Sequence, residues 1–145
     1  AQIDRMIEKA RRALGGSFEG RKVCVLGLSF KPNTDDVRES RSLVLCERLL
    51  AAGATVRAHD PVAMAEAVKE VPGIQPADDA YDAAAGAELV ILATEWNQYR
   101  LLDMARLRGI VARPVFLDLR NVYDKDRMAA AGFAYEGVGR GGRIA

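Results

Sequence analysis

Two basic side chains, Lys31 and Arg120, are the residues of this sequence best suited to binding a phosphate group. Lysine carries a compact charge, and the planar guanidinium of arginine can hold two phosphate oxygens at once. Phe30 precedes Lys31 and could lie against a ring or the face of a sugar. Lysine and arginine are mostly exposed in proteins, so their types alone favour solvated surface residues over a binding site.

A second group of polar residues surrounds Arg38. Asp35, Asp36 and Glu39 form a small acidic cluster around it. Carboxylates could bind a metal ion, but carboxylates before a helix more commonly cap it and interact with its dipole. We therefore expect no metal site here, and an ion pair of Arg38 with one of these acids is the simpler interpretation.

The other reactive residue types have weaker support as catalytic groups. Cys24 and Cys46 lie within apolar runs, which predicts small core residues rather than nucleophiles. His59 has no visible serine or cysteine partner, so we expect no catalytic role for it. Trp96 is best interpreted as a packing residue. None of these residues predicts a catalytic centre by itself.

The apolar patterns that must position these residues alternate between strand and helix. Short runs rich in valine, leucine and isoleucine predict buried strands, and apolar residues three or four apart predict helices. This alternation is typical of a Rossmann-like α/β fold, a parallel sheet with helices on both faces, here preceded by an N-terminal helix. The expected strands are residues 22–28, 55–59, 88–93, 115–118 and 133–135, and the expected helices are residues 4–14, 41–52, 62–69, 77–85, 102–107 and 124–131.

The candidate phosphate-binding residues follow the carboxyl ends of predicted strands. Lys31 comes after the strand at 22–28, and Arg120 comes after the strand at 115–118. Ligands of parallel sheets bind beyond these ends, so we expect the two residues at one edge of the sheet. Thr94, Glu95 and Trp96 follow a third strand and should project from the same edge.

The standard dinucleotide-binding fingerprint is absent from the first strand's end. Gly27 is followed by Leu28, Ser29 and Phe30 rather than by further glycines, so a pyrophosphate could not approach the backbone. Asp60 stands where a ribose-binding acid would lie, but a turn role before a proline is the better interpretation. The fold is therefore expected to be dinucleotide-like without the usual dinucleotide site.

Length and charge favour one ordinary domain. The chain has 145 residues and a formal net charge of +1. This charge is too small to attract nucleic acid or an anionic membrane electrostatically. No apolar run approaches the roughly 20 residues of a membrane span, and no signal peptide is visible. Two separated cysteines favour a reduced, cytoplasmic protein. The chain begins with alanine rather than methionine, which suggests a fragment.

Four ordered segments resemble the C-terminal domain of the UDP-glucose and GDP-mannose dehydrogenases. Residues 20–61 resemble the start of that domain, and residues 93–100 resemble a segment typical of the UDP-glucose branch. The other two are an aspartate-x-arginine motif at 116–124 and a closing segment at 132–140. In order, they read GRKVCVLGLSFKPNTDDVRESRSLVLCERLLAAGATVRAHDP, ATEWNQYR, FLDLRNVYD and GFAYEGVGR.

This resemblance implies a role in oxidising a sugar nucleotide. The family's enzymes oxidise the C6 alcohol of UDP-glucose to a carboxylate with two NAD⁺, and their C-terminal domain closes over the UDP-sugar. By resemblance, Phe30, Lys31 and Arg120 bind the substrate, and Arg38 reaches the NAD side. Residues 1–16 correspond to the end of a linking helix, and residues 17–145 to the sugar-nucleotide-binding domain. A homo-oligomeric full-length protein is also implied.

The resemblance places the chemistry outside this chain. In the family, NAD is bound mainly by an N-terminal domain, and the catalytic cysteine that forms a thioester lies in a central region. Neither segment is present in the 145 residues, so we expect no catalytic residue and no dehydrogenase activity from the chain alone.

Two residues depart from the family's pattern. Arg41 stands where many relatives have proline, at the start of a helix. Leu119 stands where glycine is common; a positive φ there would strain it and alter the pose of Arg120.

Two alternatives remain open. One is a related UDP-N-acetylhexosamine or GDP-mannose dehydrogenase domain, and the other is a free-standing nucleotide-binding module. The helix at 4–14 should discriminate the second: its apolar face should be uncovered in a fragment and packed on the sheet in a free-standing module.

Overall fold

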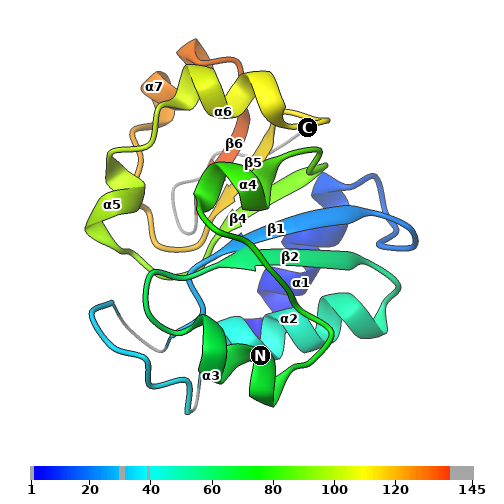
Figure 1. The fold of residues 1–145 in the computed structure, drawn as a ribbon. Helices are drawn as coiled ribbons and strands as arrows, with labels where there is room; N and C mark the ends of the chain where they lie inside the picture. The colour runs from blue at the N-terminus through cyan, green and yellow to red at the C-terminus, as the bar shows by residue number, and fades with distance from the viewer. Residues whose placement is uncertain (1, 30–31, 39, 138–145) are drawn as a thin grey trace.

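The computed structural model describes residues 2–29, 32–38 and 40–137. This part of the chain forms one six-stranded sheet in which all paired strands are parallel (Figure 1), and it confirms the Rossmann-like fold. The chain runs outward from the centre on one side, then returns to the centre and runs outward on the other. The strands, in spatial order, are β3 (Gln75–Pro76), β2 (Thr55–His59), β1 (Lys22–Leu26), β4 (Leu89–Leu92), β5 (Val115–Asp118) and β6 (Ala134–Gly137).

Helices cover both faces of the sheet because successive strand residues point to opposite sides. Val23 and Val25 pack in one apolar cluster, whereas Cys24 and Leu26 pack in the other. No helix of the described residues is long and apolar enough to cross a membrane. The first face carries α1 (Gln2–Ala13), α2 (Arg41–Ala51) and α3 (Met64–Glu70), and the second carries α4 (Ala80–Ala84), α5 (Asn97–Arg100), α6 (Met104–Ile110) and α7 (Lys125–Ala130) (Figure 1).

The N-terminus of α2 is hydrogen-bonded to the loop after β1. Ser40 caps this helix: its Oγ accepts a hydrogen bond from Leu43 N at 3.3 Å and donates one to Leu28 O at 2.8 Å. Arg41 is the first residue of α2. The helix therefore begins at this position although many relatives have proline there.

Helix α1 packs against the sheet, contrary to the uncovered face expected of a fragment. Ala10 and Leu14 are fully buried, and α1 contacts both α2 and β5. Lys9 Nζ also lies 2.7 Å from Glu136 Oε2 on β6. Residues of α1, α2 and β5 share one apolar cluster on this face of the sheet. A packed helix is the outcome expected of a free-standing module, so this criterion does not support a fragment.

Candidate functional site

The carboxyl edge of the sheet brings together the loops that follow β1, β2, β4 and β5. The strand order reverses between β1 and β4, and ligands of such sheets bind at this reversal. Phe30 and Lys31, the two substrate-binding candidates in the loop after β1, lie outside the described residues. The site can therefore be described from Leu28 and Ser29 on one side and from the loops after β4 and β5 on the other.

Arg120 lies at this edge and is fixed by Asp118, the last residue of β5. Asp118 is fully buried, and its Oδ1 accepts a hydrogen bond from Arg120 N at 3.0 Å. Its Oδ2 accepts from Val122 N at 2.8 Å, Tyr123 N at 3.0 Å and the Tyr135 hydroxyl at 2.6 Å. One buried carboxylate thus sets the backbone of the whole turn that carries Arg120.

The Arg120 guanidinium reaches across to the loop after β4. Its Nη2 lies 2.7 Å from Glu95 Oε1, and 43 % of the arginine side chain remains exposed. Exposed ion pairs of this kind contribute only about 0–1 kcal/mol. A phosphate group could therefore compete with Glu95 for the guanidinium. The sequence placed Arg120 and Glu95 at the same edge but did not predict that they pair.

The strain anticipated at Leu119 does not arise. The positive φ in this turn belongs to Asn121, at 55°, and not to Leu119. Asparagine tolerates the left-handed region better than most residues. Leu119 is buried and joins the apolar cluster on the α1 side, so its side chain anchors the turn.

The loops after β1 and β4 touch directly. Gly27 has a φ of 94°, and a Cβ at this position would lie 2.4 Å from Thr94 Cβ. Thr94 Oγ1 donates a hydrogen bond to Ser29 O at 3.0 Å. The close backbone approach that a dinucleotide site uses for pyrophosphate is used here to pack two loops together.

Asp60 confirms the predicted turn role and has a second one. Its Oδ1 accepts hydrogen bonds from Val62 N at 2.9 Å and Ala63 N at 2.8 Å. Its Oδ2 accepts from Leu28 N at 2.8 Å and from Trp96 Nε1 at 3.2 Å. Trp96 is buried, as predicted, but its indole N–H contact with Asp60 was not anticipated.

Arg38, the residue expected on the NAD side, forms an ion pair with Asp36. Its Nε and Nη2 each lie 3.0 Å from an oxygen of that carboxylate, and 88 % of the arginine side chain is exposed. Glu39, a further member of the acidic cluster, lies outside the described residues. The geometry matches the simpler interpretation of Arg38 and leaves its side chain accessible at the surface.

His59, at the end of β2, takes part in a buried structural contact. Tyr99 Oη donates to His59 O at 2.9 Å, and His59 Nδ1 lies 2.9 Å from the same Oη. A phenol has one proton, so Nδ1 must carry its own hydrogen and donate it to Tyr99. Burial lowers the pKa of His59 and so favours the neutral ring.

Both cysteines are buried and unpaired, as the sequence predicted. Burial raises the pKa of Cys24, and it raises the pKa of Cys46 to about 12. Nucleophilic cysteines act as thiolates, so neither residue is suited to attack a substrate.

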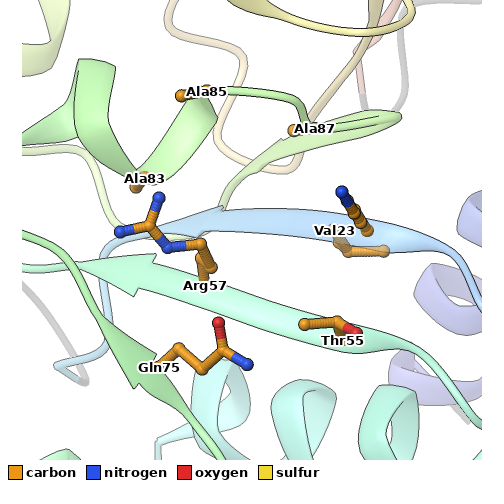
Figure 2. A pocket seen from close by; sticks show the side chains of 8 residues that line it. Val23, Thr55, Arg57, Gln75, Ala83, Ala85 and Ala87 are labelled. Atoms are coloured by element: carbon orange, nitrogen blue, oxygen red, sulfur yellow. The ribbon is translucent and has the colours of Figure 1, made fainter.

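A cavity of about 260 Å³ lies at the opposite, amino end of the sheet. Figure 2 shows Arg57 and Gln75 on neighbouring strands, with Ala83 of α4 facing them. Arg57 Nη1 donates to Asp82 O at 2.6 Å, and its Nη2 lies 3.2 Å from Asp82 Oδ2. The cavity is therefore separate from the carboxyl edge, and its arginine is already neutralised. Its lining residues are Lys22, Val23, Thr55, Arg57, Gln75, Ala83, Ala85 and Ala87.

The parallel strand order, with its reversal between β1 and β4, defines a Rossmann-like α/β domain. The chain belongs to the UDP-glucose/GDP-mannose dehydrogenase family, because the sequence profile of that family's UDP binding domain matches residues 24–125.

Individual relatives agree with this assignment. The chain is 45 % identical to a UDP-glucose 6-dehydrogenase of Rhizobium meliloti (strain 1021), over 93 % of this chain and 31 % of the relative. It is 38 % identical to the solved UDP-glucose dehydrogenase of Pyrobaculum islandicum, with a TM-score of 0.76, over 93 % of this chain and 29 % of the other. An NDP-N-acetyl-D-galactosaminuronic acid dehydrogenase from Methanosarcina mazei Go1 gives 28 % identity and a TM-score of 0.79, over 96 % and 29 % of the two chains. The chain spans about a third of the length of the curated relatives it matches.

Proposed function

We propose that this chain is the UDP-sugar-binding domain of an NAD-dependent UDP-glucose 6-dehydrogenase, which converts UDP-glucose to UDP-glucuronate. The main support is Arg120: the buried Asp118 holds its backbone N–H at the carboxyl edge, and its guanidinium stays accessible beside Glu95. Membership of the family and likeness to UDP-glucose 6-dehydrogenases support the same substrate. In this proposal the full-length protein is a homo-oligomer.

The domain's own task is to bind and orient the substrate. Arg120 exchanges its ion pair with Glu95 for one with the diphosphate of the UDP-sugar, and its planar guanidinium can hold two phosphate oxygens. Phe30 and Lys31 bind the same ligand from the loop after β1. Closing the domain over the sugar holds the reacting group in place and excludes water. Residues 1–16 are proposed as the end of a helix that links this domain to a central one.

The described residues do not fit NAD at the standard position of this fold. Gly27 is packed against Thr94, and both carboxylate oxygens of Asp60 already accept hydrogen bonds. We therefore propose that NAD binds mainly outside this chain. Arg38 is the residue proposed to approach it, by exchanging Asp36 for a cofactor phosphate.

An amide NMR titration of the chain with UDP-glucose tests the proposal, with ADP as the control ligand. We expect shifts clustered at Arg120, Glu95, Ser29 and the loop after β1, and much smaller ones there with ADP, which has a diphosphate but neither uracil nor glucose. A few charged contacts must offset an association cost of about 4–15 kcal/mol, so the expected Kd is on the order of millimolar or weaker. Equal shifts with ADP would indicate a generic nucleotide module. Absence of any shift would move the test to the longer protein.

A related sugar nucleotide is the second candidate, because the fold is also close to that of the Methanosarcina mazei enzyme. Repeating the titration with GDP-mannose and with a UDP-N-acetylhexosamine distinguishes these substrates. Tighter binding of either one than of UDP-glucose would identify a sister branch of the family.

A further inference from the structure

We infer that Asp60 is a positioning residue for the UDP-sugar site and that it acts through Trp96 and the backbone of the loop after β1. The inference rests on the proposed function. Asp60 is only 3 % exposed, although an unpaired buried carboxylate would carry a large desolvation cost. Its environment must therefore supply enough hydrogen-bond donors to stabilise it.

The donors come from three separate loops. Val62 and Ala63 donate their N–H groups to Oδ1 from the loop after β2. Leu28 N donates to Oδ2 at 2.8 Å and Ser29 N at 3.3 Å, both from the loop after β1. Trp96 Nε1 donates to the same oxygen at 3.2 Å from the loop after β4. Asp60 therefore links the loops after β1, β2 and β4 through hydrogen bonds to one carboxylate.

These contacts continue to the proposed ligand-binding group. Trp96 follows Glu95 in the chain, and the Glu95 carboxylate pairs with Arg120 at 2.7 Å. Ser29 is fixed a second time, since its carbonyl accepts from Thr94 Oγ1. Moving the indole would thus move Glu95 and the loop after β1 relative to Arg120. Misplacing binding groups in this way weakens ligand binding without removing any group that touches the ligand.

Two substitutions separate this role from simple structural support. Trp96→Phe retains an aromatic ring and removes the N–H donor. Asp60→Asn keeps the shape but replaces one acceptor oxygen with an NH₂ group, and either orientation turns that group toward N–H donors. Asp103→Asn is the matched control, because Asp103 caps α6 through Arg106 N at 3.1 Å, away from the site.

The experiment combines UDP-glucose titration with NMR of the indole N–H, which is a single resonance because the chain has one tryptophan. In Asp60→Asn we expect that resonance to shift and to exchange faster with water, and the Kd for UDP-glucose to rise about tenfold. We expect a rise of about three- to tenfold in Trp96→Phe and no change in Asp103→Asn. The effects of Asp60→Asn and Trp96→Phe should be non-additive in the double variant.

Each outcome decides the inference. Folded Trp96→Phe and Asp60→Asn chains that bind UDP-glucose as tightly as the original would overturn it while leaving the proposed function intact. If the original chain and the longer protein bind no UDP-sugar, the proposed function fails and the inference falls with it. If Asp60→Asn does not fold, Trp96→Phe decides, with urea unfolding used to verify that its stability is retained.

Discussion

The pairing of Arg120 with Glu95 leads to the first prediction. Replacing Glu95 with glutamine should raise the affinity for UDP-glucose by a factor of about 1.4 to 5, because the guanidinium no longer gives up an ion pair worth about 0.2–1 kcal/mol. Isothermal titration calorimetry or the NMR titration measures the change. Glu88→Gln is the matched control, since Glu88 pairs with Arg21 at the same 2.7 Å at the other end of the sheet. A loss of affinity in Glu95→Gln would mean that Glu95 itself contacts the sugar.

The buried histidine makes stability depend on pH. Burial holds the folded-state pKa of His59 below its usual 6.5, so below that pH the unfolded chain binds the proton more readily. Stability should be full above pH 6.5 and fall as the pH drops toward the folded-state pKa. The neighbouring Asp60 and Asp79 charges oppose the shift without reversing it.

Urea unfolding at neutral pH and at mildly acidic pH tests this expectation. His59→Asn retains an N–H donor toward Tyr99 and should lose this component of the pH dependence. The chain has one histidine, so its NMR titration assigns the group directly. A His59 that titrates at or above 6.5 in the folded chain would contradict the prediction.

At this scale the sequence predicted which residue types stand at the carboxyl edge but not how they are held. Arg120 and Glu95 could be placed because each follows an apolar run. The carboxylates of Asp60 and Asp118 accept hydrogen bonds from distant partners: Trp96 Nε1 lies 36 positions from Asp60, and the Tyr135 hydroxyl lies 17 positions from Asp118. Such pairings follow from strand order, which a single sequence does not specify.

The junction of β1 and β4 leads to a prediction at the scale of elements. Gly27→Ala should lower the free energy of unfolding by about 2–5 kcal/mol, because it combines an unfavourable φ of 94° with a contact of 2.4 Å to Thr94 Cβ. Gly86→Ala is the control: its φ is 73°, but no atom lies within 4 Å of the added Cβ, so only the conformational cost of about 1–2 kcal/mol applies. Urea denaturation should rank the two variants in this order, and equal losses would show that the loops do not pack as described.

Helix α1 can be tested as part of the domain's core. Leu14→Ala should cost about 2–5 kcal/mol, since Leu14 is fully buried just beyond α1. Leu101→Ala should cost less than about 0.5 kcal/mol, because Leu101 is 85 % exposed. Chemical denaturation of both variants makes the comparison. A negligible effect at Leu14 would mean that α1 is only loosely attached to the sheet.

The sequence predicted the bounds of two strands and missed two short elements altogether. β2 and β5 have the predicted bounds, whereas β3 and α5 were not predicted. β3 has two residues, one of them Pro76, which cannot donate to a ladder, and α5 has one turn. The helix expected at 62–69 begins instead at Met64, because the N–H groups of Val62 and Ala63 are turned toward Asp60.

For the molecule as a whole, the decisive question is what the chain can do without the remaining two thirds of its relatives' length. We expect no reduction of NAD⁺ when the 145-residue chain is mixed with UDP-glucose, as followed by NADH absorbance. The reason lies in the chain itself: Cys24 and Cys46 are buried with raised pKa values, and the glycines of a dinucleotide site are absent. The UDP-glucose 6-dehydrogenase of Rhizobium meliloti (strain 1021), to which the chain is similar, is the positive control. NADH formation by the chain alone that disappears when both cysteines are changed to alanine would place the chemistry in this domain, and the proposal of a substrate-binding domain would have to be abandoned.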